Sequence, residues 1–364
     1  MYNTIAAQLG SKYSASGLFN TIKLGHLNIP DDLKATLAHN MNHAVAKNTW
    51  SAYNSGIKKL GEFAEETGTS ISLPLSEETT LAFSAWILNT GVSAATLETY
   101  LSAARMLHLT EGTNPPQLRT QLVSTVLKGK KNADMLQKRT GASNSRLPMT
   151  PALLRLFKLE LRESGRPLED KKMIWCAATV AFSAGLRGGE FLCRKAAVFD
   201  PDTALRAKDM NLDTFTVHGE SFEILKLKLR GEKQNRTSAS TICDIYPSQS
   251  SLCPIRAFKA WSHVRTADEP DLPAFRFQDG PNMSIGAFNK ILKETLAPHT
   301  KNLRGSISSH SFRIGLASCL GSLGFSDEQV MAAGRWSSRA YQTYMKLPRT
   351  KRLEMARAIA KSVN

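Results

Sequence analysis

Cysteine is scarce in this chain, and the few copies have no regular spacing. The five cysteines among 364 residues are an odd number, and no two of them form a CxxC pair. A disulfide framework needs an even set and most structural zinc sites need such pairs, so the sequence indicates neither. We expect free thiols in a reducing compartment.

Long apolar runs are also missing. No stretch is long enough to span a bilayer, and the N-terminal sequence MYNTIAAQLGSKYSASG lacks a basic start followed by an apolar core. We therefore predict neither a membrane partner nor a secretory signal. No internal repeat is visible.

Positive charge is abundant and unevenly distributed. The net charge is +16, with 47 Lys/Arg against 31 Asp/Glu. Residues 1–124 carry a net −1, residues 125–147 a net +5, and residues 148–364 the remaining +12. This distribution favours a polyanionic partner, DNA or RNA, over an acidic small molecule, and it assigns the positive field to the later part of the chain.

Residues 31–127 are predicted to form an all-α domain of four or five helices, preceded by an arm over residues 1–30. Apolar residues recur at helical spacing up to about Thr67, after Ser76 and after Ser93, and again over residues 117–128. His39 and His43 lie four residues apart, but two imidazoles without a Cys or carboxylate partner make a poor metal site. We predict no metal ion and no cofactor.

Residues 128–149 have the composition of a domain linker, because they are polar and basic and include glycine and serine. Since the preceding domain is nearly neutral, we interpret this segment as a strap on a DNA backbone. The residues predicted to neutralise phosphates are Lys128, Lys130, Lys131, Lys138 and Arg139.

Residues 150–349 are predicted to form a mixed α/β domain. Thr150 and Pro151 suit the start of a helix, and alternating patterns over residues 214–217, 222–229 and 241–246 predict three strands between helical segments. A polar loop containing Lys233 joins the second strand to the third. An amphipathic helix over residues 350–364 ends the chain.

The last fifth of the sequence contains four side chains that can converge on one phosphate. His310 and Arg313 are three residues apart and share one face of a helix. Trp336 offers an indole N–H donor, and Tyr344 offers a phenol. Earlier in the chain, glycines surround Arg187 and allow a tight bend at a helix junction.

An arginine at a glycine-rich junction, a lysine on a hairpin, His-x-x-Arg, a Trp after Gly-Arg and a Tyr eight residues later occur in this order. The set resembles that of the tyrosine recombinase (phage integrase) family. The phrases GRWSSRAYQTYMK and TWSAYNSGIKKLGEFAEE are most similar to recombinases of eukaryotic mobile elements of the Crypton, DIRS and Ngaro types. The matching positions are Arg187, Lys233, His310, Arg313, Trp336 and Tyr344, with Glu190 in place of the acid that often follows the first arginine.

The resemblance covers most of residues 48–349 and implies both a fold and an activity. The fold is mainly α with a small antiparallel β-sheet: an all-α SAM-like core-binding domain followed by a mixed α/β catalytic domain. The implied activity is the cutting and rejoining of DNA through a 3′-phosphotyrosine intermediate, without a metal ion. A nuclear location follows if the host is eukaryotic, and otherwise the cytoplasm or nucleoid.

In the implied mechanism, Tyr344 is the nucleophile that attacks a backbone phosphorus, with Tyr341 one helical turn away as the alternative. Arg187 and Arg313 bind the non-bridging oxygens and neutralise the charge that grows in the transition state. Trp336, where most members have histidine, adds a third donor.

The same resemblance implies the residues that move protons. Lys233 protonates the 5′-oxygen leaving group, with Lys226 and Lys228 as alternatives on the preceding strand. His310, titrating near neutrality, assists proton transfer. Glu190 orients His310 or Arg187.

The expected partners are double-stranded DNA at element ends or at a target site, and further copies of the chain: a dimer on one site and a tetramer in the synapse. The C-terminal helix is the segment expected to contact a neighbouring protomer. Three alternatives remain open: a type IB topoisomerase or telomere resolvase, a domesticated DNA-binding protein that no longer cuts, and a metal-dependent transposase or nuclease.

Overall fold

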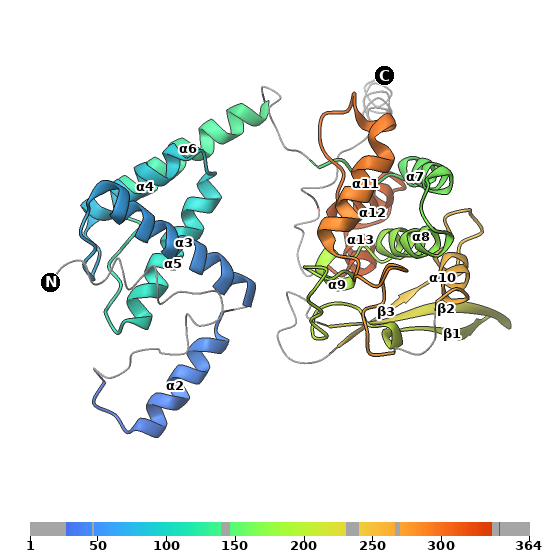
Figure 1. The fold of residues 1–364 in the computed structure, drawn as a ribbon, viewed down its shortest axis with the longest axis horizontal. Helices are drawn as coiled ribbons and strands as arrows, with labels where there is room; N and C mark the ends of the chain where they lie inside the picture. Colours follow the sequence, from blue (N-terminus) through green and yellow to red (C-terminus); the bar gives the residue numbers. More distant parts are fainter. Residues whose placement is uncertain are drawn as a thin grey trace, which may run out of the picture. The chain divides into compact units, whose positions relative to one another are not determined.

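Helices dominate the architecture, and the chain divides into two compact units, Met1–Ser143 and Asn144–Asn364. The computed structural model describes residues 27–45, 47–139, 146–230, 240–265, 270–336 and 342. In that part of the chain no helix is long and apolar enough to cross a membrane. Figure 1 labels the helices and strands of both units.

The first unit is all-α in the described residues. Its helices are α2 (Asp31–His43), α3 (Lys47–Thr67), α4 (Glu77–Asn89), α5 (Ala94–Thr110) and α6 (Gln121–Arg139). Two of them begin as the sequence predicts, because the hydroxyl oxygens of Ser76 and Ser93 accept hydrogen bonds from the main-chain N–H groups three residues later.

Close packing of α3 against α5 organises the core of this unit. Gly56 on α3 allows the approach, since a Cβ at this position would lie 2.9 Å from the Cβ of Ala103 on α5. At the end of α5, the buried His108 accepts a hydrogen bond from the Leu75 main-chain N–H at 2.9 Å and pairs through Nδ1 with the Ala104 carbonyl. Burial lowers the pKa of His108, so the neutral imidazole is the form that the core holds.

Helix α6 extends further than the sequence analysis predicts. Residues 128–139, which were assigned to the linker, continue the helix to Arg139. The reason is Asp134, which accepts a hydrogen bond from the Ala94 main-chain N–H at 3.0 Å and forms an ion pair with Lys130. This contact joins residues 40 positions apart and holds the basic segment against the first unit. Composition alone predicted a linker here.

The second unit combines helices with one small sheet. Its helices are α7 (Pro151–Glu163), α8 (Leu168–Ser183), α9 (Gly188–Phe191), α10 (Pro254–Ser262), α11 (Ile285–Thr300), α12 (His310–Ser322) and α13 (Asp327–Gly334), with a short 3₁₀ turn η1 (Ala207–Asp209) before the sheet. Thr150 caps α7 as predicted, and Ser326 forms a capping box with Gln329 at the start of α13.

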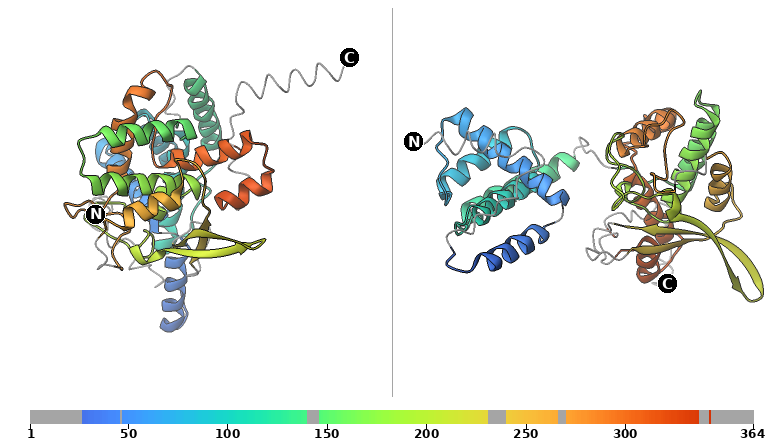
Figure 2. Two further views of the ribbon diagram at one scale, coloured as in Figure 1. Left: turned by 90° about the vertical axis from the view of Figure 1, so that its right-hand side faces the viewer. Right: turned by 60° about the horizontal axis from the view of Figure 1, so that its bottom comes forward.

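The sheet is antiparallel, with strands β1 (Met210–Val217), β2 (Glu220–Leu229) and β3 (Thr241–Ile245) in sequence order. Figures 1 and 2 show the β1–β2 hairpin projecting past the helices of this unit. Leu227 of β2 pairs with Met210 of β1 and with Cys243 of β3, so these three side chains share one sheet face. Strand β1 starts four residues before the predicted strand, because the polar residues Asn211 and Asp213 on its outer face hide the pattern.

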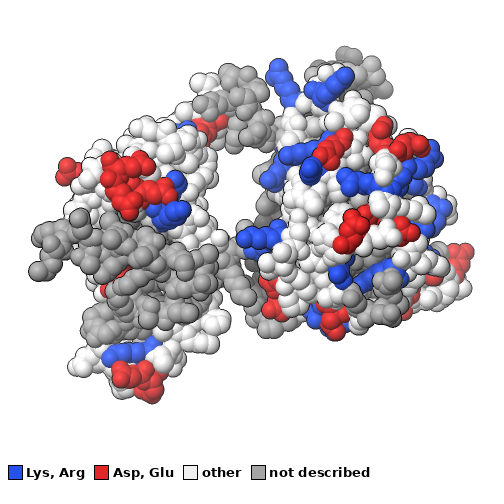
Figure 3. Space-filling model, viewed as in Figure 1, with Lys and Arg blue, Asp and Glu red and all other residues white. Residues whose placement is uncertain are grey.

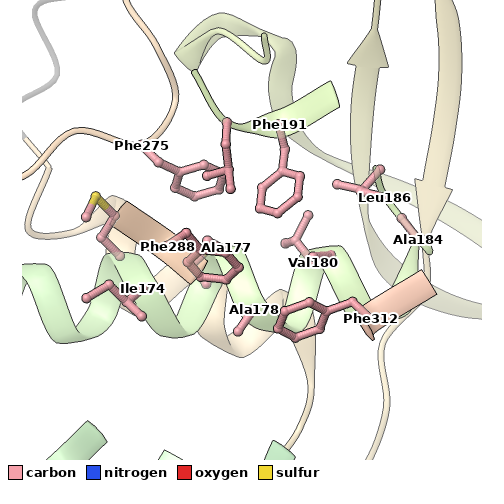
Figure 4. Packing of buried hydrophobic residues seen from close by; sticks show 14 of the residues in the cluster. Ile174, Ala177, Ala178, Val180, Ala184, Leu186, Phe191, Phe275, Phe288 and Phe312 are labelled. Carbon is pink, nitrogen blue, oxygen red and sulfur yellow. The ribbon is translucent and has the colours of Figure 1, made fainter. Parts of the chain in front are cut away.

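Helix α8 is the centre of the core of the second unit. It contacts α7, α10 and α12, and Figure 4 shows aromatic rings packed against its small residues, with Phe288 and Phe312 stacked at a centroid distance of 5.8 Å. The C-terminal end of α8 leads directly into the turn that contains Arg187. The predicted fold class, mainly α with a small antiparallel sheet, is confirmed.

Candidate active site

The turn from α8 to α9 positions Arg187 and Glu190. Gly185 has a φ of +55°, a left-handed conformation that suits glycine and ends α8. Arg187 then precedes α9, and its main-chain N–H and Nη1 donate to the two carboxylate oxygens of Glu190 at 2.9 and 2.6 Å. Glu190 is 4% exposed. Of the two expected targets of this carboxylate, it therefore binds Arg187.

Helix α12 carries His310 and Arg313 and brings them to the turn between α8 and α9. Arg313 is 2% exposed, and its Nη1 donates to the Gly185 carbonyl at 2.6 Å. The helix approaches the chain at Met149 so closely that a Cβ on Gly315 would lie 2.8 Å from the Met149 carbonyl carbon. The Ser309 side chain does not cap this helix, and the main-chain N–H of Ser309 donates to Asn289 Oδ1 at 2.6 Å.

The end of α13 supplies Trp336. Its indole ring is buried, and the guanidinium carbon of Arg313 lies 4.3 Å from the ring centroid, a cation–π contact. Gly334 makes this position possible, because a Cβ there would overlap three atoms of the ring. Packing therefore requires glycine at position 334, because a larger residue would collide with the Trp336 ring.

Arg335 belongs to the site although the sequence analysis did not select it. Its Nη1 donates to the Ala184 carbonyl at 2.7 Å, and its Nη2 donates to Glu190 at 3.0 Å. The two carbonyls at the end of α8, those of Ala184 and Gly185, therefore each accept a hydrogen bond from an arginine more than 120 residues further along the chain. Adjacency to Trp336 was the signal available in the sequence.

His310 is half-buried beside three guanidinium groups. Burial lowers its pKa to about 4, and the charges of Arg146, Arg313 and Arg187 act in the same direction. The prediction that His310 titrates near neutrality is therefore wrong for the protein alone, because the neutral imidazole persists well below pH 6. Arg146, which the analysis left out of the DNA-binding residues, is tied to this unit by a bridge between its strand segment and Ser306.

The alternative lysines of β2 point away from this cluster. Successive strand residues alternate between faces, so Lys226 and Lys228 lie on the opposite face from Cys243, which is 3.4 Å from Arg335. Lys226 forms an ion pair with Asp213 on that outer face. Neither lysine is placed to serve the arginine cluster.

Three predicted catalytic positions fall outside the described residues: Lys233 in the connection between β2 and β3, and the tyrosines at 341 and 344. Among the predicted DNA-binding residues, Lys130 pairs with Asp134 and Lys131 pairs with Glu98 at 2.8 Å, while Lys128 is exposed. Lys138 and Arg139 lie at the end of α6. Figure 3 shows Lys and Arg side chains spread over one face of the second unit, interspersed with acidic ones.

No group of three or more metal-ligating side chains occurs among the described residues. His39 and His43 contact each other with ring centroids 4.3 Å apart, and His43 Nδ1 pairs with the His39 carbonyl. This pair has the features of a helix-surface contact.

Residues 38–109 match the model of the phage integrase N-terminal SAM-like domain. No curated protein matches the sequence of the chain. The fold of the whole chain, however, is that of tyrosine recombinases, as three kinds of solved structure illustrate.

The first is the XerH site-specific recombinase bound to palindromic difH substrate, at 16% identity and a TM-score of 0.58, covering 98% of this chain and 94% of that one. The second is the Tn1549 transposon integrase in complex with circular intermediate DNA, at 16% identity and a TM-score of 0.53, covering 90% and 98%. The third is a lambda integrase dimer bound to a COC′ core site, at 15% identity and a TM-score of 0.53, covering 87% and 93%.

Proposed function

We propose that this chain is a site-specific DNA recombinase that cuts and rejoins duplex DNA during integration or excision of a mobile element. The observation that carries the proposal is the grouping of Arg187, His310, Arg313 and Trp336 around the α8–α9 turn, in a chain with the tyrosine recombinase fold. The subtype that we favour is the recombinase of eukaryotic mobile elements, on the sequence resemblance. For a eukaryotic host the proposed location of the chain is the nucleus. For a bacterial host it is the cytoplasm or nucleoid.

The proposed reaction is a transesterification at phosphorus. The phenolic oxygen of Tyr344 forms a bond to a backbone phosphorus, and the bond from phosphorus to the 5′-oxygen breaks. The products are a 3′-phosphotyrosine and a free 5′-hydroxyl. Lys233 gives the 5′-oxygen its proton, and His310 receives the proton of the phenol. Rejoining is the reverse reaction with another 5′-hydroxyl, so no external energy source is required.

The arginines supply the electrostatic part of the mechanism. Two guanidiniums from separate elements, Arg187 and Arg313, meet the non-bridging oxygens and stabilise the charge of the pentavalent transition state. Loss of one such donor typically lowers the rate by about 10²–10³-fold. This arrangement performs the work that a metal ion does in other phosphoryl transfers, which is why we propose that the reaction proceeds without one.

His310 responds to the substrate in this scheme. In the protein alone, burial and the neighbouring guanidiniums keep its pKa at about 4. A phosphodiester carries one negative charge, so its arrival between Arg187 and Arg313 offsets their positive field. The pKa of His310 then rises on binding, in the direction that makes the imidazole a better proton acceptor when the phenol must lose its proton.

We further propose how the rest of the chain holds DNA. The helical unit and the catalytic unit over residues 150–349 each bind the duplex, and the basic C-terminal part of α6, residues 128–139, contacts the DNA backbone. Lys128, Lys138 and Arg139 are the best candidates there, because Lys130 and Lys131 pair with acidic residues of their own unit. Two protomers bind one site and four form the synapse, with residues 350–364 of each docking on a neighbour.

The proposal is tested with DNA that the protein itself selects. Duplexes enriched from a random library by the purified chain are rebuilt with a nick near the candidate cleavage position, so that a cut strand is lost and the covalent intermediate accumulates. Denaturing electrophoresis then detects the adduct. We expect an adduct that forms in EDTA, persists in Tyr341→Phe and is absent in Tyr344→Phe.

Other results select among the alternatives. An adduct lost in Tyr341→Phe but kept in Tyr344→Phe moves the nucleophile. Cleavage and resealing without strand exchange between two duplexes indicates a topoisomerase or telomere resolvase. Specific binding without any adduct indicates a DNA-binding protein that no longer cuts, and cleavage abolished by EDTA indicates a metal-dependent enzyme.

A further inference from the structure

Arg335 has an unusual backbone for its residue type. Its φ and ψ are 52° and 48°, the left-handed conformation, where it caps the end of α13. For residues other than glycine this conformation is unfavourable, and asparagine is the side chain that tolerates it best. The arginine at this position therefore needs an explanation in the contacts of its side chain.

The guanidinium of Arg335 joins three separate elements. It binds the Ala184 carbonyl at the end of α8, it binds Glu190 of α9, and it lies against the sulfur of Cys243 on β3. The side chain is only 13% exposed. Arg335 is therefore largely shielded from solvent, and it contacts Glu190, which in turn contacts Arg187.

Glu190 is the point at which Arg335 acts on the site. One carboxylate oxygen accepts from Arg187 Nη1, while the other accepts from the Arg187 main-chain N–H and from Arg335 Nη2. Because this carboxylate is buried, a single cation compensates its charge poorly. Arg335 supplies a second cation and a further donor to the oxygen that also accepts from the Arg187 main-chain N–H, so it strengthens the hold on the carboxylate that orients the Arg187 guanidinium.

Arg335 also couples the two halves of the cluster. Its main chain precedes Trp336, which stacks on Arg313, and its side chain reaches the turn that carries Arg187. A shift at the end of α13 is thereby transmitted to both guanidiniums of the cluster.

We propose that Arg335 is a positioning residue for DNA cleavage: through Glu190 it holds Arg187 in the orientation that binds the scissile phosphate. This inference rests on the proposed function and adds a residue to it. The predicted consequence is a defect in the chemical step that leaves DNA binding unchanged.

The test variant is Arg335→Asn, because asparagine accepts the left-handed backbone and is too short to reach the partners of the guanidinium. The matched control is Arg162→Asn, which removes an arginine that is 74% exposed in the same unit and pairs with Glu163 on the surface. Both are compared with the unaltered chain for affinity in gel shifts and for the rate of adduct formation on the nicked duplex. We expect Arg335→Asn to bind within about twofold but to cleave roughly 10–100-fold more slowly, since small misplacements of a catalytic group have costs of this size.

A second substrate separates positioning from damage to the fold. Replacing one non-bridging oxygen of the scissile phosphate by a methyl group gives a neutral methylphosphonate, which needs less positive charge in the transition state. If Arg335 acts through Arg187, the defects of Arg335→Asn and Arg187→Ala shrink together on this substrate. The double variant Arg335→Asn/Glu190→Gln should also be no slower than the slower single variant, because both changes act on one contact.

The outcomes distinguish this proposal from the one on which it depends. If the unaltered chain forms no adduct, the proposed function itself fails. If the unaltered chain cleaves, two results refute only the positioning role. One is that Arg335→Asn cleaves as fast as the unaltered chain, and the other is that its cleavage defect has the same size on the phosphate and on the methylphosphonate. Additive defects in the double variant refute it as well.

Discussion

The substitution Gly334→Ala tests how Trp336 is packed in the candidate site. A Cβ at this position would overlap three atoms of the Trp336 ring. Because carbon atoms in contact lie about 3.5–4.0 Å apart, the ring has to move by at least about 2 Å to make room. The ring is buried between the Arg313 guanidinium and the small cluster formed with Ala317 and Val330, so such a movement breaks the cation–π contact and opens this packing.

The magnitude follows from two opposing terms. Overpacking of this kind typically destabilises by about 1–3 kcal/mol, while glycine to alanine at a helical position gains up to about 1 kcal/mol, and less at a helix end. We expect a net loss of about 2 kcal/mol, which lowers the Tm by roughly 4–8 °C for a unit of this size. Adduct formation should fall by about 10²-fold, as for other displaced catalytic groups.

The measurement is thermal unfolding followed by circular dichroism, combined with the adduct assay. Gly286→Ala in α11 is the control, because a Cβ there meets only Ser284 Oγ at 3.8 Å, an ordinary contact. It should unfold at or slightly above the temperature of the unaltered chain. A Gly334→Ala protein that melts and cleaves like this control would refute the described position of the Trp336 ring.

Three further predictions follow from close packing and buried histidines. Gly315→Ala places a Cβ against the Met149 main chain; neither backbone can yield, so we expect a loss of about 3 kcal/mol or more, measurable by denaturant unfolding. In NMR titrations His310 should be neutral at pH 7 and should titrate at about pH 4. Its contribution to stability is fully present above about pH 6.5 and is lost as the pH falls toward the folded-state value; a His310→Gln variant should show a flatter profile in this range. The lowered pKa of His108 has the same sign, so the first unit should lose stability below about pH 6.5, and a calorimetric transition insensitive to pH would contradict the hydrogen bond from Leu75.

Local signals in the sequence predicted much of the fold. Helix starts at Ser76, Ser93, Thr150 and Ser326 depend on hydrogen bonds within four residues, so they can be identified from the residues alone. The change of period around residue 214 likewise predicted the sheet. These features need no knowledge of distant parts of the chain.

Contacts between distant residues explain what the sequence did not predict. The extension of α6 depends on Asp134 reaching Ala94, and the pairing of Glu190 with Arg335 spans 145 residues. The low pKa of His310 results first from burial, and the charge of Arg146, a residue that composition places in a linker, lowers it further. In each case the residue type alone is compatible with a position in solvent. Only its contact with a distant residue shows that it has a structural role.

The two arginines on the end of α8 have a consequence for when the site can form. During synthesis of the chain, Ala184 and Gly185 are added long before Arg335 and Arg313, whose guanidiniums bind their carbonyls. A growing or truncated chain that ends before these residues already contains Arg187, yet it lacks the groups that fix the turn beneath it. Contacts of such long sequence separation form late in folding. Assembly of the cluster is therefore tied to completion of the polypeptide, and an unfinished chain contains the first arginine without the rest of its site.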